Sequence, residues 1–69
     1  MSKKISINTE YITLGQFLKY VSIISSGSEA KMFLIEHEVF VNGDLETRRG
    51  RKLYPGYKVL VLNTVYEVE

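Results

Sequence analysis

The chain has 69 residues, 45% hydrophobic and 25% charged, and its formal net charge is +1. A chain of this length buries only about 60% of the surface that its unfolded form exposes, which argues against a deep catalytic cleft. The lack of cysteine excludes a disulfide framework or a thiolate metal site and fits a reducing compartment. The basic start is not followed by the apolar segment of a signal peptide, and the sequence contains no run of about 18 apolar residues. We therefore expect a cytoplasmic protein without a membrane span.

The first predicted elements are a strand and a helix. In residues 4–8, isoleucine alternates with polar residues, which is the period of a strand with one buried face. Thr13 and Gln16 are spaced for a capping box, in which each side chain binds the backbone N–H of the other residue. A helix over residues 13–21 is predicted from the apolar residues at helical spacing, which are Leu14, Phe17, Leu18 and Val21.

A second helix is predicted over residues 27–37, again from helical spacing. Ser26 stands three residues before Glu29, so a second capping box is expected at its start. His37 lies between two glutamates, but consecutive helical residues point about 100° apart and cannot chelate one ion. We expect His37 to end the helix, where a partial positive charge suits the helix dipole.

The rest of the sequence predicts strands and tight turns. Val39 and Val41 alternate with Phe40, which predicts a strand, and the Asn-Gly pair at 42–43 tolerates the positive φ angles of a hairpin turn. Tyr-Pro-Gly-Tyr at 54–57 fits a type II turn. A strand follows at 58–62, and a last strand at 65–69 is expected to pair with it or to lie near the N-terminal strand. The predicted fold class is α+β, with an N-terminal strand and two short helices packed on a small antiparallel sheet with hairpins.

Positive charge is concentrated in one segment. The span from Thr47 to Tyr66 has no carboxylate and five cations, which are Arg48, Arg49, Arg51, Lys52 and Lys58. Such a patch binds phosphate backbones through counterion release, and arginine grips phosphate with two hydrogen bonds. A loop that serves only solubility and a nuclear-import signal are the alternatives. Tyr54 and Tyr57 could stack on bases beside the patch, although tyrosines that flank a turn more often anchor it by packing.

Other chemistry finds little support in the sequence. Asp44 and Glu46 could share one face of a strand, but we expect them on a solvated rim that shifts no pKa. His37 has no Ser or Asp partner at local spacing, and glycine-rich nucleotide-binding patterns do not occur. The second helix carries Lys31 among several glutamates, which argues against its entry into a DNA groove. We therefore expect no enzymatic activity, no metal or other cofactor, and no small-molecule substrate.

Three stretches resemble the S4 RNA-binding domain family, in particular its small stand-alone bacterial members of the YaaA type. They are SGSEAK at 26–31, EVFVNG at 38–43 and LYPGYKV at 53–59, and the match runs without gaps from about Thr13 to Leu62. The resemblance implies a single S4-like (αL) domain over residues 1–69. It also implies that the helix pair and the hairpin after Asn-Gly form an L-shaped surface for structured RNA.

The basic positions of the family are only partly kept in this sequence. Lys31 occupies the basic position in the second helix, whereas Thr13, Gly27 and Asp44 stand where many members have basic residues. We hypothesise that the missing charge is restored further along the same sheet, close to Lys31, by Arg48, Arg49, Arg51 and Lys52. The resemblance thus implies docking on structured or ribosomal RNA in aid of ribosome assembly or translation. A protein-interaction module for an acidic partner protein and a DNA-binding protein are the alternatives.

Overall fold

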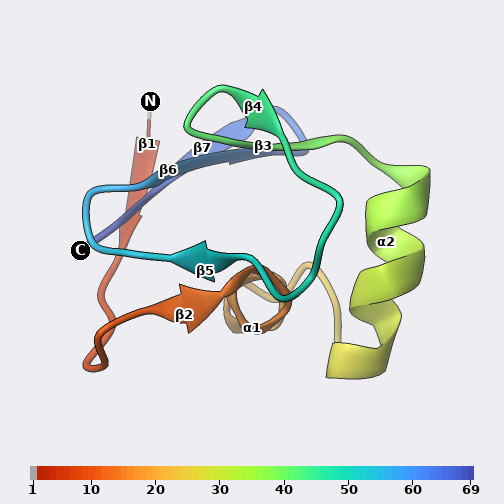
Figure 1. Ribbon diagram of the computed structural model, residues 1–69, viewed down its shortest axis with the longest axis horizontal. Helices are drawn as coiled ribbons and strands as arrows, with labels where there is room; N and C mark the ends of the chain where they lie inside the picture. The colour runs from red at the N-terminus through yellow and green to blue at the C-terminus, as the bar shows by residue number, and fades with distance from the viewer. Residues whose placement is uncertain (1) are drawn as a thin grey trace.

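Two short helices accompany two β-sheets in residues 2–69, the part of the chain that the computed structural model describes (Figure 1). The elements are β1 (Ser2–Ile5), β2 (Ile12–Thr13), α1 (Leu14–Tyr20), a 3-10 turn (Gly27–Glu29), α2 (Ala30–Glu36), β3 (Val39–Val41), β4 (Asp44–Leu45), β5 (Lys52–Leu53), β6 (Lys58–Val61) and β7 (Thr64–Val68). This arrangement confirms the expected α+β fold class.

The larger sheet has the strand order β1-β7-β6-β3-β4, and its strands β7, β6, β3 and β4 pair in antiparallel fashion. The first strand differs from the expected antiparallel sheet, because β1 runs parallel to β7 with Ser2 opposite Val65 and Ile5 opposite Val68. Parallel neighbours need a long connection, and here almost the whole chain lies between the two strands. The strand expected at 4–8 ends at Ile5, and the Ile7 N–H donates to the carbonyl of Glu69 at 3.1 Å.

Both expected tight turns are confirmed by the backbone. Asn42 and Gly43 adopt φ angles of 53° and 89° between β3 and β4, as the Asn-Gly pair predicts. Gly56 has a φ of 97°, and the Tyr57 N–H donates to the carbonyl of Tyr54 at 3.0 Å, which closes the second turn.

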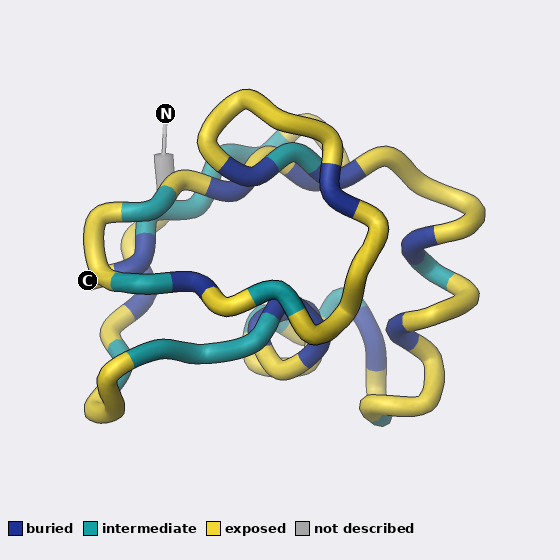
Figure 2. The backbone as a smooth tube through the Cα atoms, viewed as in Figure 1, coloured by how far each residue is buried: buried dark blue, intermediate teal, exposed yellow. Residues whose placement is uncertain are grey.

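Helix α1 packs its apolar face against the inner face of the larger sheet. The predicted capping box is present, with the Gln16 N–H donating to the Thr13 hydroxyl and the Thr13 N–H donating to the Gln16 side chain. Phe17 is fully buried, and its ring meets the Tyr66 ring of β7 edge to face at 5.2 Å. The buried stretches of α1, β3 and β6 form one core, as Figure 2 shows.

The start of α2 differs from the expected capping box. Residues Gly27–Glu29 form the 3-10 turn, and the Ser26 hydroxyl caps no backbone N–H. The Glu29 carboxylate instead accepts hydrogen bonds from the Ser25 hydroxyl at 2.8 Å and the Ser26 hydroxyl at 3.3 Å. These bonds, above all the one from the Ser25 side chain, lower the pKa of Glu29. The Glu29 carboxylate thus accepts hydrogen bonds from serine hydroxyls and does not take part in a capping box.

Candidate nucleic-acid interface

Residues 47–52, the basic loop, lead from the end of β4 into the first residue of β5 and carry four cations. Strand β5 pairs with β2 in the smaller sheet, with Lys52 opposite Thr13 and the fully buried Leu53 opposite Ile12. We expected the basic cluster to lie further along the sheet of the hairpin. It leads instead into the smaller sheet, so this expectation was wrong. Strand β4 has only two residues, and the chain then leaves the larger sheet (Figure 1). The residue that follows β4, Glu46, is buried.

The backbone of the basic loop is hydrogen-bonded to the beginning of α1. The Leu14 N–H donates to the carbonyl of Arg51 and the Gly15 N–H donates to the carbonyl of Arg49, each at 2.8 Å. The first N–H groups of a helix lack partners within the helix, so these carbonyls satisfy groups that would otherwise need water. The helix start thereby holds the backbone of the loop.

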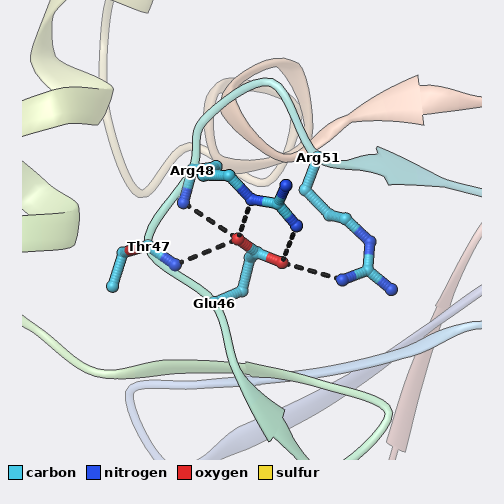
Figure 3. A network of polar contacts seen from close by, with 4 residues as sticks. All are labelled: Glu46, Thr47, Arg48 and Arg51. Carbon is cyan, nitrogen blue, oxygen red and sulfur yellow. Dashed lines mark hydrogen bonds and ion pairs between the residues drawn. The ribbon is translucent and has the colours of Figure 1, made fainter.

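Glu46 holds the side chains of two of the arginines (Figure 3). Its carboxylate accepts five hydrogen bonds, from the backbone N–H groups of Thr47 and Arg48 and from the Arg48 and Arg51 guanidinium groups. The Glu46 Oε2 to Arg48 Nε distance is 3.0 Å, and the Oε1 to Arg51 Nη1 distance is 2.7 Å. The side chain of Glu46 is only 6% exposed. The expectation that Glu46 lies on a solvated rim was therefore wrong.

These contacts shift the ionisation of both partners. The side-chain hydrogen bonds from Arg48 are the largest of the influences that lower the pKa of Glu46 to about 2, against the opposing effect of burial. The Glu46 carboxylate in turn raises the pKa of Arg48. Glu46 therefore stays ionised at neutral pH and offsets part of the positive charge of the loop. In the sequence, we considered the carboxylate-free span from Thr47 onward. We did not connect the basic residues with Glu46, which immediately precedes that span.

The four cations of the basic loop differ in solvent exposure and in whether they form an ion pair. The Arg48 side chain is 75% exposed and that of Arg51 is 30% exposed, and both are held by Glu46. Arg49 and Lys52 are exposed, and neither forms an ion pair within residues 2–69. The Lys52 Nζ lies 5.0 Å from the centroid of the Tyr11 ring. Arg49 and Lys52 are thus the side chains most available to an external anion.

Lys31 is exposed on the first turn of α2, whose beginning lies close to the basic loop. A Cβ atom placed on Gly15 would lie 3.5 Å from the Cβ of Arg49 and 3.6 Å from the Cβ of Ala30. Gly15 therefore brings the residue before Lys31 and the backbone of the loop to the same side of α1. The joint action of Lys31 and the loop stays a prediction.

Aromatic rings border the basic loop. The rings of Tyr11 and Tyr54 have centroids 5.6 Å apart, and those of Tyr54 and Tyr57 are 5.7 Å apart. Tyr57 also packs against the core, which fits the expected role of anchoring the turn. The sequence did not single out Tyr11, because it reaches this group only through the pairing of the two-residue strands β2 and β5.

Features of other kinds of site are weak in the described residues. His37 ends α2 as expected, and its ring stacks on Phe33 with centroids 4.6 Å apart. No group of three or more metal-ligating side chains gathers within residues 2–69. The helices of this part of the chain are all too short or too polar to cross a membrane.

Fold and sequence together define this chain as an S4 domain. The S4 domain family matches residues 5–69, so the chain belongs to that family, as the stretches at 26–31, 38–43 and 53–59 indicated. The chain is also similar to the probable ribosome maturation protein RlbA of Bacillus subtilis (strain 168). The two are 62% identical over 56 residues, which cover 81% of this chain and 79% of RlbA.

Proposed function

We propose that residues 1–69 act as one non-catalytic RNA-docking domain, which binds structured or ribosomal RNA through the basic loop and the start of α2. The observation that carries this proposal is a basic loop whose backbone is tied to α1 while Arg49 and Lys52 remain exposed and unpaired within the described chain. Membership of the S4 domain family supports RNA as the ligand.

Phosphate groups are the chemical feature that this surface suits. Arg48 uses its Nε and Nη2 to bind Glu46, and Arg51 uses its Nη1, so each guanidinium keeps N–H donors that are not engaged with the carboxylate. Because Glu46 already orients both groups, less side-chain entropy is lost when they meet a phosphate. Such contacts position an RNA backbone without reading its sequence.

The biological setting that we propose is ribosome assembly in the cytoplasm. The similar protein from Bacillus subtilis is named a probable ribosome maturation protein, and a domain that recognises folded RNA by its backbone suits such a task. The partner would then be structured ribosomal RNA, with or without a ribosomal protein beside it. No small-molecule substrate is part of this proposal.

The test measures binding to a blunt RNA hairpin over a range of salt concentrations. The logarithmic slope should change by about 0.7 to 0.9 for each phosphate that the protein no longer neutralises. A double variant, Arg49→Ala with Lys52→Ala, should therefore flatten the slope by roughly 1.4 to 1.8. The matched control is Lys3→Ala with Lys4→Ala, which removes two exposed lysines from β1. Equal slopes for the two double variants would show that the basic loop is not the binding surface.

The rival functions predict different results in two further experiments. An acidic protein partner predicts that crosslinking in cells recovers protein with RNA at background level. DNA binding predicts that a DNA hairpin of the same sequence binds at least as tightly as the RNA hairpin. RNA binding through the wide, shallow groove and 2′-hydroxyl groups of an A-form helix predicts a preference for the RNA hairpin.

A further inference from the structure

An open pocket lies where the basic loop meets the turn after β5. Its lining residues are Arg48, Gly50, Arg51, Lys52, Tyr54 and Tyr57. The pocket therefore combines cationic side chains with two aromatic rings, and the ring of Tyr11 extends the aromatic row beyond Tyr54. Phosphate contacts use the cations but leave the aromatic rings without a role.

The arrangement of the rings and cations is held by the fold. Tyr54 and Tyr57 flank the Pro-Gly turn, with their ring planes inclined at 58°. The Arg51 guanidinium carbon lies 5.9 Å from the centroid of the Tyr57 ring, and its Nη1 donates a hydrogen bond to Glu46 at 2.7 Å. The pocket is thus built before any ligand arrives, which lowers the entropy cost of binding.

Anchoring of the turn accounts for only one of the two tyrosines. Tyr57 packs against the hydrophobic core and closes the turn through its N–H. Tyr54 is half-buried and contacts Tyr11 and Tyr57 while it lines the pocket. An aromatic ring beside cations is the combination with which proteins bind unpaired nucleotides, because every base has a face that can stack.

We propose that this pocket binds an unpaired base of the RNA, stacked on Tyr54, while the basic loop holds the adjoining phosphates. This inference rests on the proposed RNA binding and names the part of the RNA that the site takes. A folded RNA with a single-stranded end or bulge beside a helix presents both features at once. Base-paired nucleotides inside a helix do not offer a free face to the pocket.

The experiment compares three RNA hairpins that share one stem. One is blunt, one carries a short single-stranded tail, and one carries a tail of the same length without bases. The tail with bases should bind about tenfold more tightly than the abasic tail, because stacking adds to the phosphate contacts that both tails make. Tyr54→Leu should remove this difference, whereas Tyr54→Phe, which keeps the ring, should retain it.

A second measurement does not depend on any variant. The protein contains five tyrosines and no tryptophan, so its intrinsic fluorescence comes from tyrosine. A base that stacks on Tyr54 should quench this fluorescence, and the abasic tail should quench it much less. This readout stays informative if Tyr54→Leu disturbs folding.

The outcomes separate this inference from the proposed function. If the blunt hairpin binds but the two tails bind equally well and quench equally, the pocket does not take a base, although RNA docking stands. The same conclusion follows if folded Tyr54→Leu keeps the full preference for the tail with bases. If none of the three hairpins binds, RNA docking itself is wrong and the inference fails with it.

Discussion

Glu46 and Arg51 stand five positions apart, and their side chains meet at 2.7 Å on the inner side of the basic loop. The pair joins the residue that follows β4 to the residue that precedes β5, and these two strands belong to different sheets. The loop therefore contains its own counter-charge, and part of its positive charge serves structure while the rest faces outward. The charges paired with Glu46 therefore bear on stability, and the remaining charges bear on the proposed RNA binding.

Replacing Glu46 by glutamine should remove a pH-dependent part of the stability. The pKa of Glu46 is lowered from 4.5 to about 2 in the folded protein, so its contribution is complete above the unfolded pKa and is lost as the pH falls through about 2. The shift corresponds to at most about 3 kcal/mol, because solvent screens the exposed Arg48. Urea unfolding between pH 5 and pH 2 should show a smaller loss of stability for Glu46→Gln than for the parent.

The matched control for this change is Asp44→Asn, which removes an exposed carboxylate two positions away. Its unfolding free energy should follow the parent curve closely. Should Glu46→Gln lose stability with acid as steeply as the parent does, the ion pairs of the basic loop would contribute nothing measurable.

Replacing Gly15 should separate helix propensity from packing against the basic loop. A Cβ atom at this position would lie 3.4 Å from the Arg49 carbonyl oxygen, at the limit of ordinary contact. Gly15→Ala should therefore stabilise the protein by up to about 1 kcal/mol, since alanine is the better helix former. Gly15→Leu should destabilise it by about 1 to 3 kcal/mol through overpacking. Thermal unfolding measures both, and a neutral Gly15→Leu would mean that loop and helix can separate freely.

Replacing Asn42 should cost more stability than replacing Asn63. Both residues have positive φ angles in tight turns, at 53° and 62°. Only Asn42 also accepts a long-range side-chain hydrogen bond, from the Lys58 N–H at 2.9 Å, among the contacts of the described chain. Asn42→Ala should therefore be less stable than Asn63→Ala by about 1 kcal/mol in urea unfolding. Equal losses would show that backbone conformation alone decides the effect.

Lys31→Ala should weaken binding of the blunt RNA hairpin and flatten its salt slope by about 0.7 to 0.9, which corresponds to one phosphate contact. The change should leave stability almost untouched, because Lys31 is exposed. If one RNA molecule contacts both α2 and the basic loop, the effect of Lys31→Ala on the salt slope should add to that of the Arg49 and Lys52 substitutions. An unchanged slope would remove α2 from the interface. Lys19→Ala, on the exposed side of α1, serves as the control.

Local patterns in the sequence predicted the elements that depend on neighbouring residues. The capping box of Thr13 and Gln16 and the turns at Asn42 and Gly56 are examples, because a few adjacent backbone angles and side chains decide them. The family, too, could be identified from such stretches. The second helix lies within the predicted range 27–37, but α2 begins only at Ala30 after a 3-10 turn, and Ser25 altered the expected cap.

Features that join distant segments could not be predicted in the same way. Strands β2 and β5 have two residues each, too few for any periodicity, yet their pairing places the basic loop beside α1 and brings Tyr11 to Tyr54. The burial of Glu46 depends on how β4 ends and on where Arg51 returns, and neither is visible in composition. The cations of the basic loop could be identified from the sequence, but the carboxylate that holds two of them, Glu46, was missed.

The pairing of β1 with β7 has a consequence for the order of folding. The Ile5 carbonyl accepts a hydrogen bond from the Glu69 N–H, and the Ser6 hydroxyl reaches the Glu69 carboxylate across 63 positions of the chain. Contacts at such separation close the largest loops and form slowly. Although β1 is made before β7, it is therefore expected to be among the last of the described strands to find its place. Until β7 is made and docked, Ile5 has no partner strand and stays exposed to other chains.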